Sequence, residues 1–337
     1  MKILFLIQGF SVAASRYRVL QYIPYLKSEG VDPTVNLYPR TLKENFQFFS
    51  DLPQYDLLFL QRKRFYQPRL GLLRGRAKRI LYDFDDAVMY RNSKAENPIS
   101  STRRRRFIQM IKNSDFVIAG NEFLKREVLP FNPNVEVIPT TIDQERYPLK
   151  TYPVQQKRVI LGWIGDHGSI HYLEKMRPLF ERIGEKYPHV ELKIVCDTFF
   201  DCDRMKVIKK NWSLEEEVAD LQGFDIGLMP LVDDPWSWGK CGLKIIQYQG
   251  VGVPVVCTPV GINRDLVEDG TNGFWAMTPE DWEKKLSLLI ENPMLREQMG
   301  LEGRRRVLEN YTYQACAPRL FSVLTRMMEK PSRGKEI

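Results

Sequence analysis

The sequence predicts an α/β protein of two doubly wound, Rossmann-like domains that face an interdomain cleft. Two observations support this fold class. Apolar, strand-like runs alternate with amphipathic, helix-like stretches, and a polar segment interrupts this alternation once. The length of 337 residues also suits two domains better than one. Strands that alternate with helices favour mainly parallel sheets that are covered on both faces.

The first series of elements begins with the apolar run KILFLIQGF, and a stretch with helical spacing follows it up to Gly30. Further strands are predicted over residues 34–38, 56–61, 79–84, 115–120 and 135–139. We therefore place an N-terminal domain at residues 1–140. The polar, proline-containing segment 141–157 is the predicted linker.

The second series supplies a C-terminal domain at residues 158–310. Its strands are predicted over residues 158–165, 190–196, 224–231, 253–259 and 273–277. A helix is predicted over 171–187, although Pro178 argues against its continuity, and another over 213–221 with Ser213 as its N-cap. From Pro279 onward the chain reads as helical. The last helix, in residues 311–337, could pack back on the N-terminal domain.

The net charge of +8 is concentrated in the first half of the chain. Residues 1–150 hold 25 Lys and Arg against 15 Asp and Glu, whereas residues 151–337 hold 25 against 27. The basic runs 61–65, 69–79 and 101–107 suit an anionic surface such as membrane headgroups, and a solvated helix face is the alternative. We expect docking through 62–79 and Arg103–Arg106.

Other compositional features restrict location and chemistry. No stretch approaches the roughly 18 consecutive apolar residues of a membrane helix, and the N-terminus lacks the features of a secretory signal. We therefore expect a cytoplasmic protein that could be peripheral on the inner membrane face. The five cysteines form no CxxC pair, so neither a disulfide framework nor a zinc site is indicated.

Three strand-to-helix turns in the second half could bind a ligand, because helix N-termini there offer free N–H groups. The first is GWIGDHGSIHYL (162–173), where Gly165, Asp166, His167 and Ser169 could receive a diphosphate. The alternative is a tight turn with Ser169 as an ordinary N-cap.

The second turn is GKCGLKIIQYQG (239–250). On one continuous helix, Lys240, Lys244 and Gln247 would share a face. Two lysines near a helix start oppose the helix dipole, which costs a few tenths of a kcal/mol unless an anion lies between them. This pattern predicts a bound diphosphate, with Gln247 on a ribose or sugar hydroxyl. A surface lysine stripe is the alternative.

The third turn follows the strand at 253–259. Backbone amides at Gly261 and Ile262 could meet a sugar or phosphate, and a helix is predicted to start near Asn263. Without other features, this segment is only a well-formed βα unit.

The motifs of this half resemble those of the retaining glycosyltransferases of family 4, which have the two-domain GT-B fold. The matching motifs are the strand GVPVV (252–256), the hairpin DGTNGF (269–274) and the trailing segment MGLEGRRRVLENYTYQ (299–314). Residues 1–30 and LYDFDDAV (81–88) resemble the acceptor-side domain of one bacterial branch. The resemblance therefore covers nearly the whole chain.

One departure from the family pattern concerns the donor site. Most of the family carries Glu-x7-Glu where this chain has Gly239 and Gln247. Gln247 could share the ribose contact of the second glutamate, but Gly239 cannot replace the first. The branch that this chain resembles has a KCxxKxxQY pattern here, so we interpret the change as a feature of the subtype.

On the acceptor side, the resemblance places a turn at Gly9 after the first strand. Arg16 and Arg18 follow and could reach the cleft, although residues two apart point differently and we expect only one to do so. Asp83, Asp85 and Asp86 end a strand. A metal-binding DxD is one explanation, but GT-B enzymes neutralise the leaving diphosphate with lysines. We assign Asp85 or Asp86 to the acceptor, with capping of the next segment as the alternative.

The resemblance implies transfer of a sugar from a nucleoside diphosphate donor to a lipid-linked or saccharide acceptor in polysaccharide or glycolipid synthesis, with retention of configuration. Lys240 and Lys244 would stabilise the leaving group, and no metal or cofactor is expected. A nucleotide-sugar epimerase is an alternative, although it needs acid/base groups and the chain has only three histidines. We do not expect nucleic-acid binding, because aromatics do not interleave with the arginines.

Overall fold

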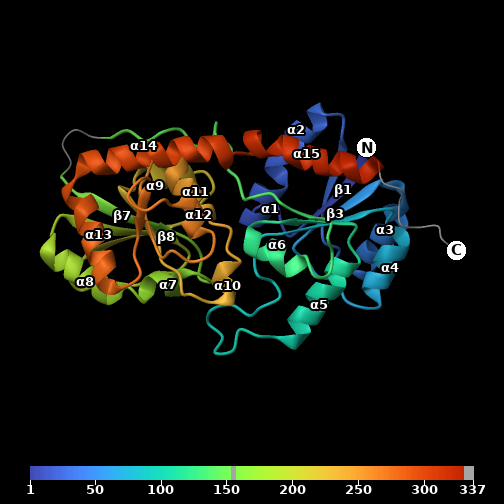
Figure 1. Ribbon diagram of the computed structural model, residues 1–337, viewed down its shortest axis with the longest axis horizontal. Helices are drawn as coiled ribbons and strands as arrows, with labels where there is room; N and C mark the ends of the chain where they lie inside the picture. Colours follow the sequence, from blue (N-terminus) through green and yellow to red (C-terminus); the bar gives the residue numbers. More distant parts are fainter. Residues whose placement is uncertain (153–156, 330–337) are drawn as a thin grey trace. The chain divides into compact units, whose positions relative to one another are not determined.

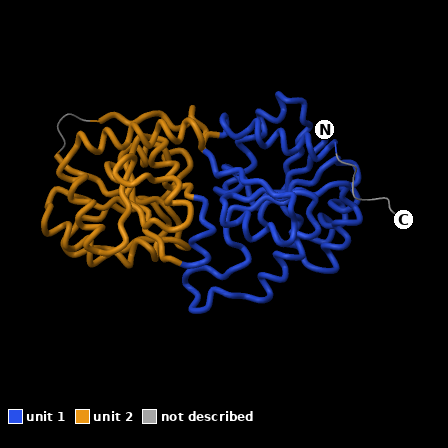
Figure 2. Tube along the Cα trace, viewed as in Figure 1, with its two compact units in different colours: residues 1–141, 234–241, 313–337 blue, residues 142–233, 242–312 orange. Residues whose placement is uncertain are grey.

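The computed structural model of the protein describes residues 1–152 and 157–329 (Figure 1). These residues divide into two compact units (Figure 2). Unit 1 contains residues 1–141, 234–241 and 313–329, and unit 2 contains residues 142–233 and 242–312. Residues 153–156 of the expected linker and 330–337 at the end of the expected C-terminal helix lie outside the described residues.

The core of unit 1 is a sheet of six parallel strands in the order β2-β1-β3-β4-β5-β6. The three central strands are buried along almost their whole length, which explains why their sequences are nearly continuous apolar runs. The strands are β1 (Lys2–Ile7), β2 (Asp32–Leu37), β3 (Leu57–Gln61), β4 (Ile80–Phe84), β5 (Phe116–Ala119) and β6 (Val135–Val137).

Helices lie on both faces of this sheet (Figure 1). The helix predicted up to Gly30 is divided into two helices and a 3₁₀ turn, because Pro24 cannot donate a backbone hydrogen bond and stands at the second residue of α2. The helical elements are α1 (Ala13–Arg18), η1 (Leu20–Tyr22), α2 (Ile23–Ser28), α3 (Leu42–Asp51), η2 (Leu52–Gln54), α4 (Arg69–Arg76), α5 (Ser101–Lys112), α6 (Glu122–Val128), α10 (Pro235–Trp238) and α15 (Tyr313–Glu329).

Helix α15 supplies part of the hydrophobic core of unit 1, although it comes from the end of the chain. Its side chains at Leu320, Val323 and Leu324 are buried in one cluster with Phe5 of β1 and Phe59 of β3. The phenyl rings of Phe5 and Phe59 lie with their centroids 5.0 Å apart. The last helix therefore covers one face of the first sheet.

Unit 2 repeats the plan with a second sheet of six parallel strands, in the order β12-β11-β10-β7-β8-β9. Edge strand β9 was not predicted, because Lys206, Lys209 and Lys210 make its sequence polar. Lysine is a frequent residue of edge strands, where it discourages pairing with other chains. The strands are β7 (Val159–Ile164), β8 (Val190–Cys196), β9 (Lys206–Asn211), β10 (Ile226–Met229), β11 (Val255–Cys257) and β12 (Gly273–Trp275).

The helices of unit 2 differ from the predictions at two places. The helix predicted over 171–187 is split before Pro178, which becomes the second residue of α8. The prediction of Ser213 as a helix N-cap is wrong, because the helix begins only at Glu217 and the Ser213 hydroxyl accepts a hydrogen bond from the Glu216 N–H in the preceding turn. The helices are α7 (Ile170–Glu174), α8 (Arg177–Lys186), α9 (Glu217–Gln222), α11 (Leu243–Gly250), α12 (Asn263–Leu266), α13 (Pro279–Glu291) and α14 (Pro293–Asn310).

Candidate active site

At the carboxyl end of β4 in unit 1, Asp83 forms a buried ion pair with Arg18. The Arg18 Nε lies 3.1 Å from Asp83 Oδ2, and another guanidinium nitrogen donates to the Ile138 carbonyl at 2.7 Å. Burial opposes the charge of Arg18, but the Asp83 carboxylate outweighs it and raises the pKa of Arg18 above its ordinary value. The Arg18 side chain is only 3% exposed. Arg18 is therefore part of the buried interior of unit 1 and does not reach the surface, contrary to the acceptor contact predicted for it.

The next two carboxylates, Asp85 and Asp86, lie beside two cations. The Asp86 carboxylate forms ion pairs with Arg62 and with Lys240, whose Nζ is 3.1 Å from Asp86 Oδ1. Arg62 Nε also lies 3.6 Å from Asp85 Oδ1. No group of three or more side chains suited to holding a metal ion occurs within the described residues. Asp86 thus links the end of β4 to the lysine that was predicted to bind a diphosphate.

Arg62 was predicted to lie in a basic surface run and was not assigned to the site. Its backbone is left-handed, with a φ of 62°. Two hydrogen bonds hold this conformation: the Arg62 N–H donates to the Asp83 carbonyl at 2.7 Å, and the Tyr82 hydroxyl donates to the Arg62 carbonyl at 2.9 Å. No local sequence pattern announces this conformation, because it depends on the neighbouring strand.

Residues 234–241 lie in unit 1, although unit 2 flanks them in the sequence. The Asn121 side chain donates to the carbonyls of Trp238 and Lys240, at 3.2 and 2.9 Å. A Cβ at Gly239 would lie 2.5 Å from the Cβ of Ala87 and 2.6 Å from its backbone nitrogen. The segment is packed so closely that a glutamate, which most of the family carries at this position, would not fit.

The expectation that Lys240 and Lys244 share one helix face is wrong. Helix α10 ends at Trp238 and α11 begins at Leu243 after Gly242, so Lys240 precedes the helix. Gly242 is left-handed, with a φ of 67°, and a Cβ there would lie 2.1 Å from Leu266 Cδ1. Lys244, in unit 2, places its Nζ 5.4 Å from the centroid of the Trp163 ring. Lys240 therefore packs within unit 1, and Lys244 packs within unit 2.

Gln247, for which a ribose contact was predicted, is directed into the core of unit 2. Its residue is only 3% exposed, and its Nε2 donates to the Tyr147 hydroxyl at 3.0 Å. That hydroxyl donates in turn to the buried Glu217 carboxylate at 3.0 Å. The amide is thus part of a buried hydrogen-bond chain, and it does not face a surface where a ribose could bind.

The loop that follows β7 contains the first predicted turn. The alternative interpretation, with Ser169 as an ordinary cap, is met only in position: Ser169 is the N-cap residue of α7, but its hydroxyl makes no capping bond and donates to Asp166 Oδ1 at 2.9 Å. His167 Nδ1 lies 2.6 Å from Asp197 Oδ2, and this hydrogen bond lowers the pKa of Asp197 to about 2. A Cβ at Gly165 would lie 2.2 Å from the Trp163 ring, so glycine is needed there.

The turn after β11 also keeps the predicted form. Gly261 has a φ of 55°, and α12 begins at Asn263. The Asn263 side chain is fully buried and donates to the Thr258 carbonyl at 2.9 Å. The buried Asn263 side chain therefore stabilises this turn.

The predicted acceptor residues near the N-terminus lie after β1. The Gly9 N–H donates to the Ser15 hydroxyl at 3.4 Å, and that hydroxyl donates to the Gln61 side chain at 2.8 Å. Arg16 is half-buried, and its guanidinium carbon is 4.9 Å from the centroid of the Tyr17 ring. These contacts fix the turn at Gly9 to β3.

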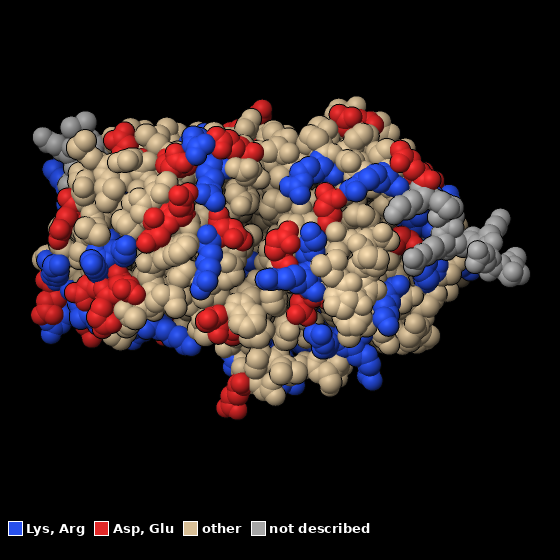
Figure 3. Space-filling model, viewed as in Figure 1, with Lys and Arg blue, Asp and Glu red and all other residues tan. Residues whose placement is uncertain are grey.

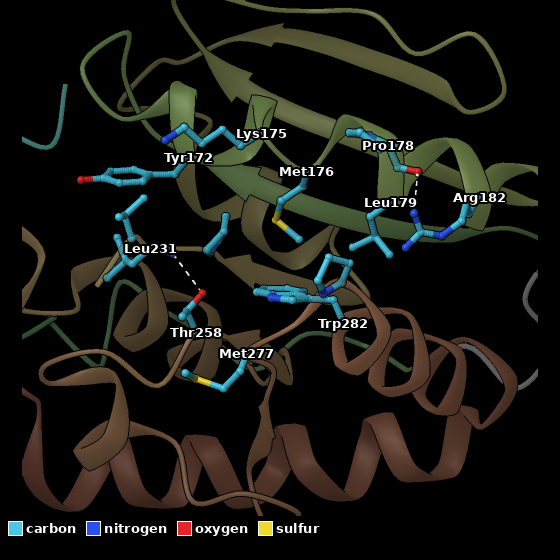
Figure 4. A pocket seen from close by; sticks show the side chains of 13 residues that line it. Tyr172, Lys175, Met176, Pro178, Leu179, Arg182, Leu231, Thr258, Met277 and Trp282 are labelled. Atoms are coloured by element: carbon cyan, nitrogen blue, oxygen red, sulfur yellow. Dashed lines mark hydrogen bonds between the residues drawn. The ribbon is translucent and has the colours of Figure 1, made fainter. Parts of the chain in front are cut away.

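A cavity of about 290 Å³ opens in unit 2 beyond the carboxyl ends of β10, β11 and β12 (Figure 4). The Trp282 ring lines it, as does Thr258, whose hydroxyl accepts a hydrogen bond from the Leu231 N–H at 3.1 Å. None of the residues predicted for the donor site lines it. It is lined by Tyr172, Lys175, Met176, Pro178, Leu179, Arg182, Pro230, Leu231, Val232, Thr258, Met277, Pro279 and Trp282.

Part of the chain is similar to known glycosyltransferases. Residues 175–322 match the family described as glycosyl transferase-like. An uncharacterized glycosyltransferase of Methanocaldococcus jannaschii is 21% identical over 360 residues, which covers 96% of this chain and 87% of the relative. The spore coat protein SA of Bacillus subtilis is 27% identical over 86 residues, or 24% of this chain. Residues 175–322 are thus the part of the chain that is similar to known glycosyltransferases.

Solved structures agree on the fold. Anabaena HepE, solved in complex with UDP and glucose, has a TM-score of 0.73 at 16% identity and covers 96% of this chain and 99% of its own. The sucrose-phosphate synthase of Thermosynechococcus elongatus has a TM-score of 0.72 at 14% identity and covers 97% and 98%. The two six-stranded parallel sheets are therefore those of the GT-B fold, which confirms the predicted fold class.

Proposed function

We propose that this enzyme transfers a sugar from a nucleoside diphosphate donor to an acceptor hydroxyl, with retention of configuration at the anomeric carbon. The observation that carries the proposal is the glycosyltransferase-family domain at residues 175–322, on a chain whose fold is GT-B throughout. A UDP-sugar is the first donor to test, because HepE was solved with UDP-glucose as well as with UDP and glucose.

In the proposed reaction, the bond between the anomeric carbon and the diphosphate oxygen breaks, and its electron pair stays on the diphosphate. Cations that lie where this charge develops stabilise the transition state more than the ground state. We assign this task to Lys240 and Lys244. The backbone amide at Gly261 and the Gly165 turn, with Asp166, His167, Ser169 and Asn263 supporting the two turns, complete the proposed donor contacts.

Unit 1 would bind the acceptor through the groups at the carboxyl edge of its sheet. Asp85 and Asp86, together with the Gly9 turn and Arg16, are the acceptor-side residues that we propose. The ion pair of Asp86 with Lys240 supports a link between the two tasks, since it joins an acceptor-side carboxylate to a donor-side cation. A lipid-linked or saccharide acceptor in polysaccharide or glycolipid synthesis, on the inner membrane face, fits the basic composition of the first half.

The test combines nucleotide binding with donor turnover. A thermal-shift screen of UDP-, GDP-, ADP- and TDP-sugars should identify the donor, because a ligand at 100 times its Kd stabilises the folded state by about 2.7 kcal/mol. With that donor, we expect Lys240→Ala and Lys244→Ala each to lower kcat by roughly 10²-fold. Lys284→Ala, on the exposed surface of α13, is the matched control. Unchanged turnover in both site variants would contradict the assignment.

Product analysis separates transfer from epimerisation. An epimerase would convert the sugar while it stays attached to the nucleotide, and this needs no acceptor. A transferase should release free nucleoside diphosphate, and the release should increase when the acceptor is added.

A further inference from the structure

The N-terminal end of α3 in unit 1 carries large apolar side chains that the protein leaves in solvent. Leu42 is 91% exposed and Phe46 is 76% exposed. They are four residues apart, so they lie on the same face of the helix, one turn from each other. Single exposed apolar residues are common, but a leucine and a phenylalanine exposed together in this way mark an interaction surface.

Four cations lie close to this part of α3, two of them in the sequence and two on the neighbouring segment. Arg40 and Lys43 flank Leu42 in the sequence and are exposed, and Lys63 and Arg69 come from the segment that packs beside α3. The Arg69 guanidinium forms a hydrogen bond with Asn45 Oδ1 and lies 6.0 Å from the centroid of the Phe49 ring, so it is next to α3 (Figure 1). We call this surface the α3 patch: Arg40, Leu42, Lys43, Phe46, Lys63 and Arg69.

The electrostatics of the patch show that its cations act on one another. Partial burial lowers the pKa of Lys63, and the positive charges of Arg69 and Arg40 lower it further. Among the described residues, none of the four cations has a carboxylate within ion-pair distance. The nearby Glu44 caps α3, where it accepts hydrogen bonds from the backbone N–H groups of Arg40 and Thr41. The patch therefore keeps an excess of positive charge.

We propose that the α3 patch is the surface by which the protein docks on an anionic lipid leaflet. Leu42 and Phe46 would enter the boundary between headgroups and acyl chains, while the four cations contact the anionic headgroups around them. A helix with apolar side chains flanked by Lys and Arg is typical of peripheral attachment in the plane of the interface. Nucleic acid would use the cations, but it would not account for an exposed leucine and phenylalanine at the centre of the patch.

This inference rests on the peripheral membrane location proposed above, and it does not depend on sugar transfer. It also assigns membrane docking to different residues. From the sequence, docking was predicted for Arg103–Arg106 and for residues 62–79. In the structure, Arg104 is paired with Glu127 at 3.0 Å and Arg103 donates to the Tyr90 carbonyl at 3.2 Å, so part of that run is engaged within unit 1. The α3 patch adds Leu42 and Phe46, which supply the apolar contact that this run lacks.

The experiment is co-sedimentation of the full chain with vesicles of phosphatidylcholine, either alone or mixed with phosphatidylglycerol. We expect binding to the mixed vesicles only. Leu42→Glu combined with Phe46→Glu should weaken binding by roughly tenfold or more, since both apolar groups leave the bilayer and two negative charges are added. Arg40→Gln combined with Lys43→Gln should also weaken it, and more so at low salt.

Met294→Glu combined with Leu301→Glu is the matched control, because these exposed apolar residues lie on α14 of unit 2. It should bind vesicles as the wild type does. Circular dichroism melting of every variant shows that the fold is kept. Phe46→Trp gives an independent readout, since its fluorescence should shift to shorter wavelength on addition of mixed vesicles.

Several results would overturn the proposal. These are equal binding to both kinds of vesicle, no binding to either, unchanged binding of the Leu42→Glu, Phe46→Glu protein, or loss of binding only when Arg103–Arg106 are replaced. Vesicle binding is measured without nucleotide, and donor turnover is measured without vesicles. A failure of the docking proposal and a failure of the proposed sugar transfer are therefore distinguishable.

Discussion

The two units share one sheet plan but differ in how their carboxyl edges are equipped. In unit 1, the edge carries charged side chains: Asp85, Asp86 and Arg62, together with Lys240. In unit 2, the corresponding edge carries turns that need glycine, at Gly165, Gly242 and Gly261. The same sheet plan thus carries side-chain charges in one unit and closely packed glycine turns in the other.

The net charge of the two units differs as well. Over the described residues, unit 1 has 26 Lys and Arg against 15 Asp and Glu, a net +11, whereas unit 2 has 21 against 26, a net −5. In the view of Figure 3, acidic and basic side chains intermingle over unit 2. The comparison teaches that the basic character of this protein belongs to one half of a duplicated architecture, and the following experiments are designed to break or sharpen that contrast.

The largest effect is expected from the buried ion pairs, of which each unit offers one. Asp83→Asn leaves the Arg18 guanidinium buried without its carboxylate, and Asp225→Asn does the same to Lys150. Removing one partner of a buried pair lowers the free energy of unfolding by about 3–5 kcal/mol. We expect each variant to lose hydrogen-exchange protection in its own unit. Equal losses in both units after either change would show that the units unfold together.

The next effect concerns the turn that separates Lys240 from α11. Gly242→Ala combines a left-handed backbone with a methyl group against Leu266, so we expect a loss of about 3 kcal/mol in the free energy of unfolding. Gly270→Ala is the control, since Gly270 has a φ of 83° but nothing within 4 Å of its added Cβ. It should cost only about 1 kcal/mol. Urea unfolding measures both, and similar losses would mean that the Leu266 contact adds nothing.

A smaller effect is expected at the charged edge of unit 1. Asp86→Asn removes the carboxylate that Arg62 and Lys240 share, so two cations are left facing each other. We expect residues 239–241 to exchange their amide hydrogens roughly tenfold faster, because a lost charged hydrogen bond is worth about 1.5–3 kcal/mol. Asp86→Glu keeps the charge and should restore slow exchange. If exchange in Asp86→Asn stays slow, the Asn121 contacts alone hold this segment.

The smallest effect is a pH dependence in unit 2. The His167 hydrogen bond lowers the pKa of Asp197 to about 2, below the value of about 4 expected for an unfolded chain. The folded-state pKa is depressed, so this contact stabilises the fold above about pH 4 and is lost as the pH falls toward 2. An NMR titration of the His167 ring should show this transition. In Asp197→Asn it should be absent.

The sequence predicted the fold class and most strands because both depend on local patterns. The apolar runs of β1, β3 and β7 are long and buried, so their periodicity is clear without a structure. The pattern failed at β9, whose sequence KVIKKN holds three lysines and only two apolar residues. Boundaries also moved at Pro24 and Pro178, where proline divided a predicted helix.

The candidate site was harder to predict because its contacts join distant parts of the chain. Arg18 and Asp83 are 65 residues apart, and no spacing rule says that their charges neutralise each other in the core. Lys240 and Lys244 were taken to lie on one helix because their spacing is helical. Gly242 was the signal that could have corrected this, since glycine before a helix often takes a left-handed conformation that ends regular structure. The requirement for glycine at position 239 could not be predicted either, because it depends on the packing of Ala87 against this position.

Helix α15 has a consequence for biosynthesis. The first 141 residues emerge early from the ribosome, yet the sheet they form lacks the cover of Leu320, Val323 and Leu324 until translation is nearly complete. Unit 2 is synthesised later, but its last helix ends before α15 begins. Its core can therefore be completed before that of unit 1. The half of the enzyme that is made first is then the half that finishes last, and a nascent chain stalled before α15 would expose an uncovered apolar face to chaperones.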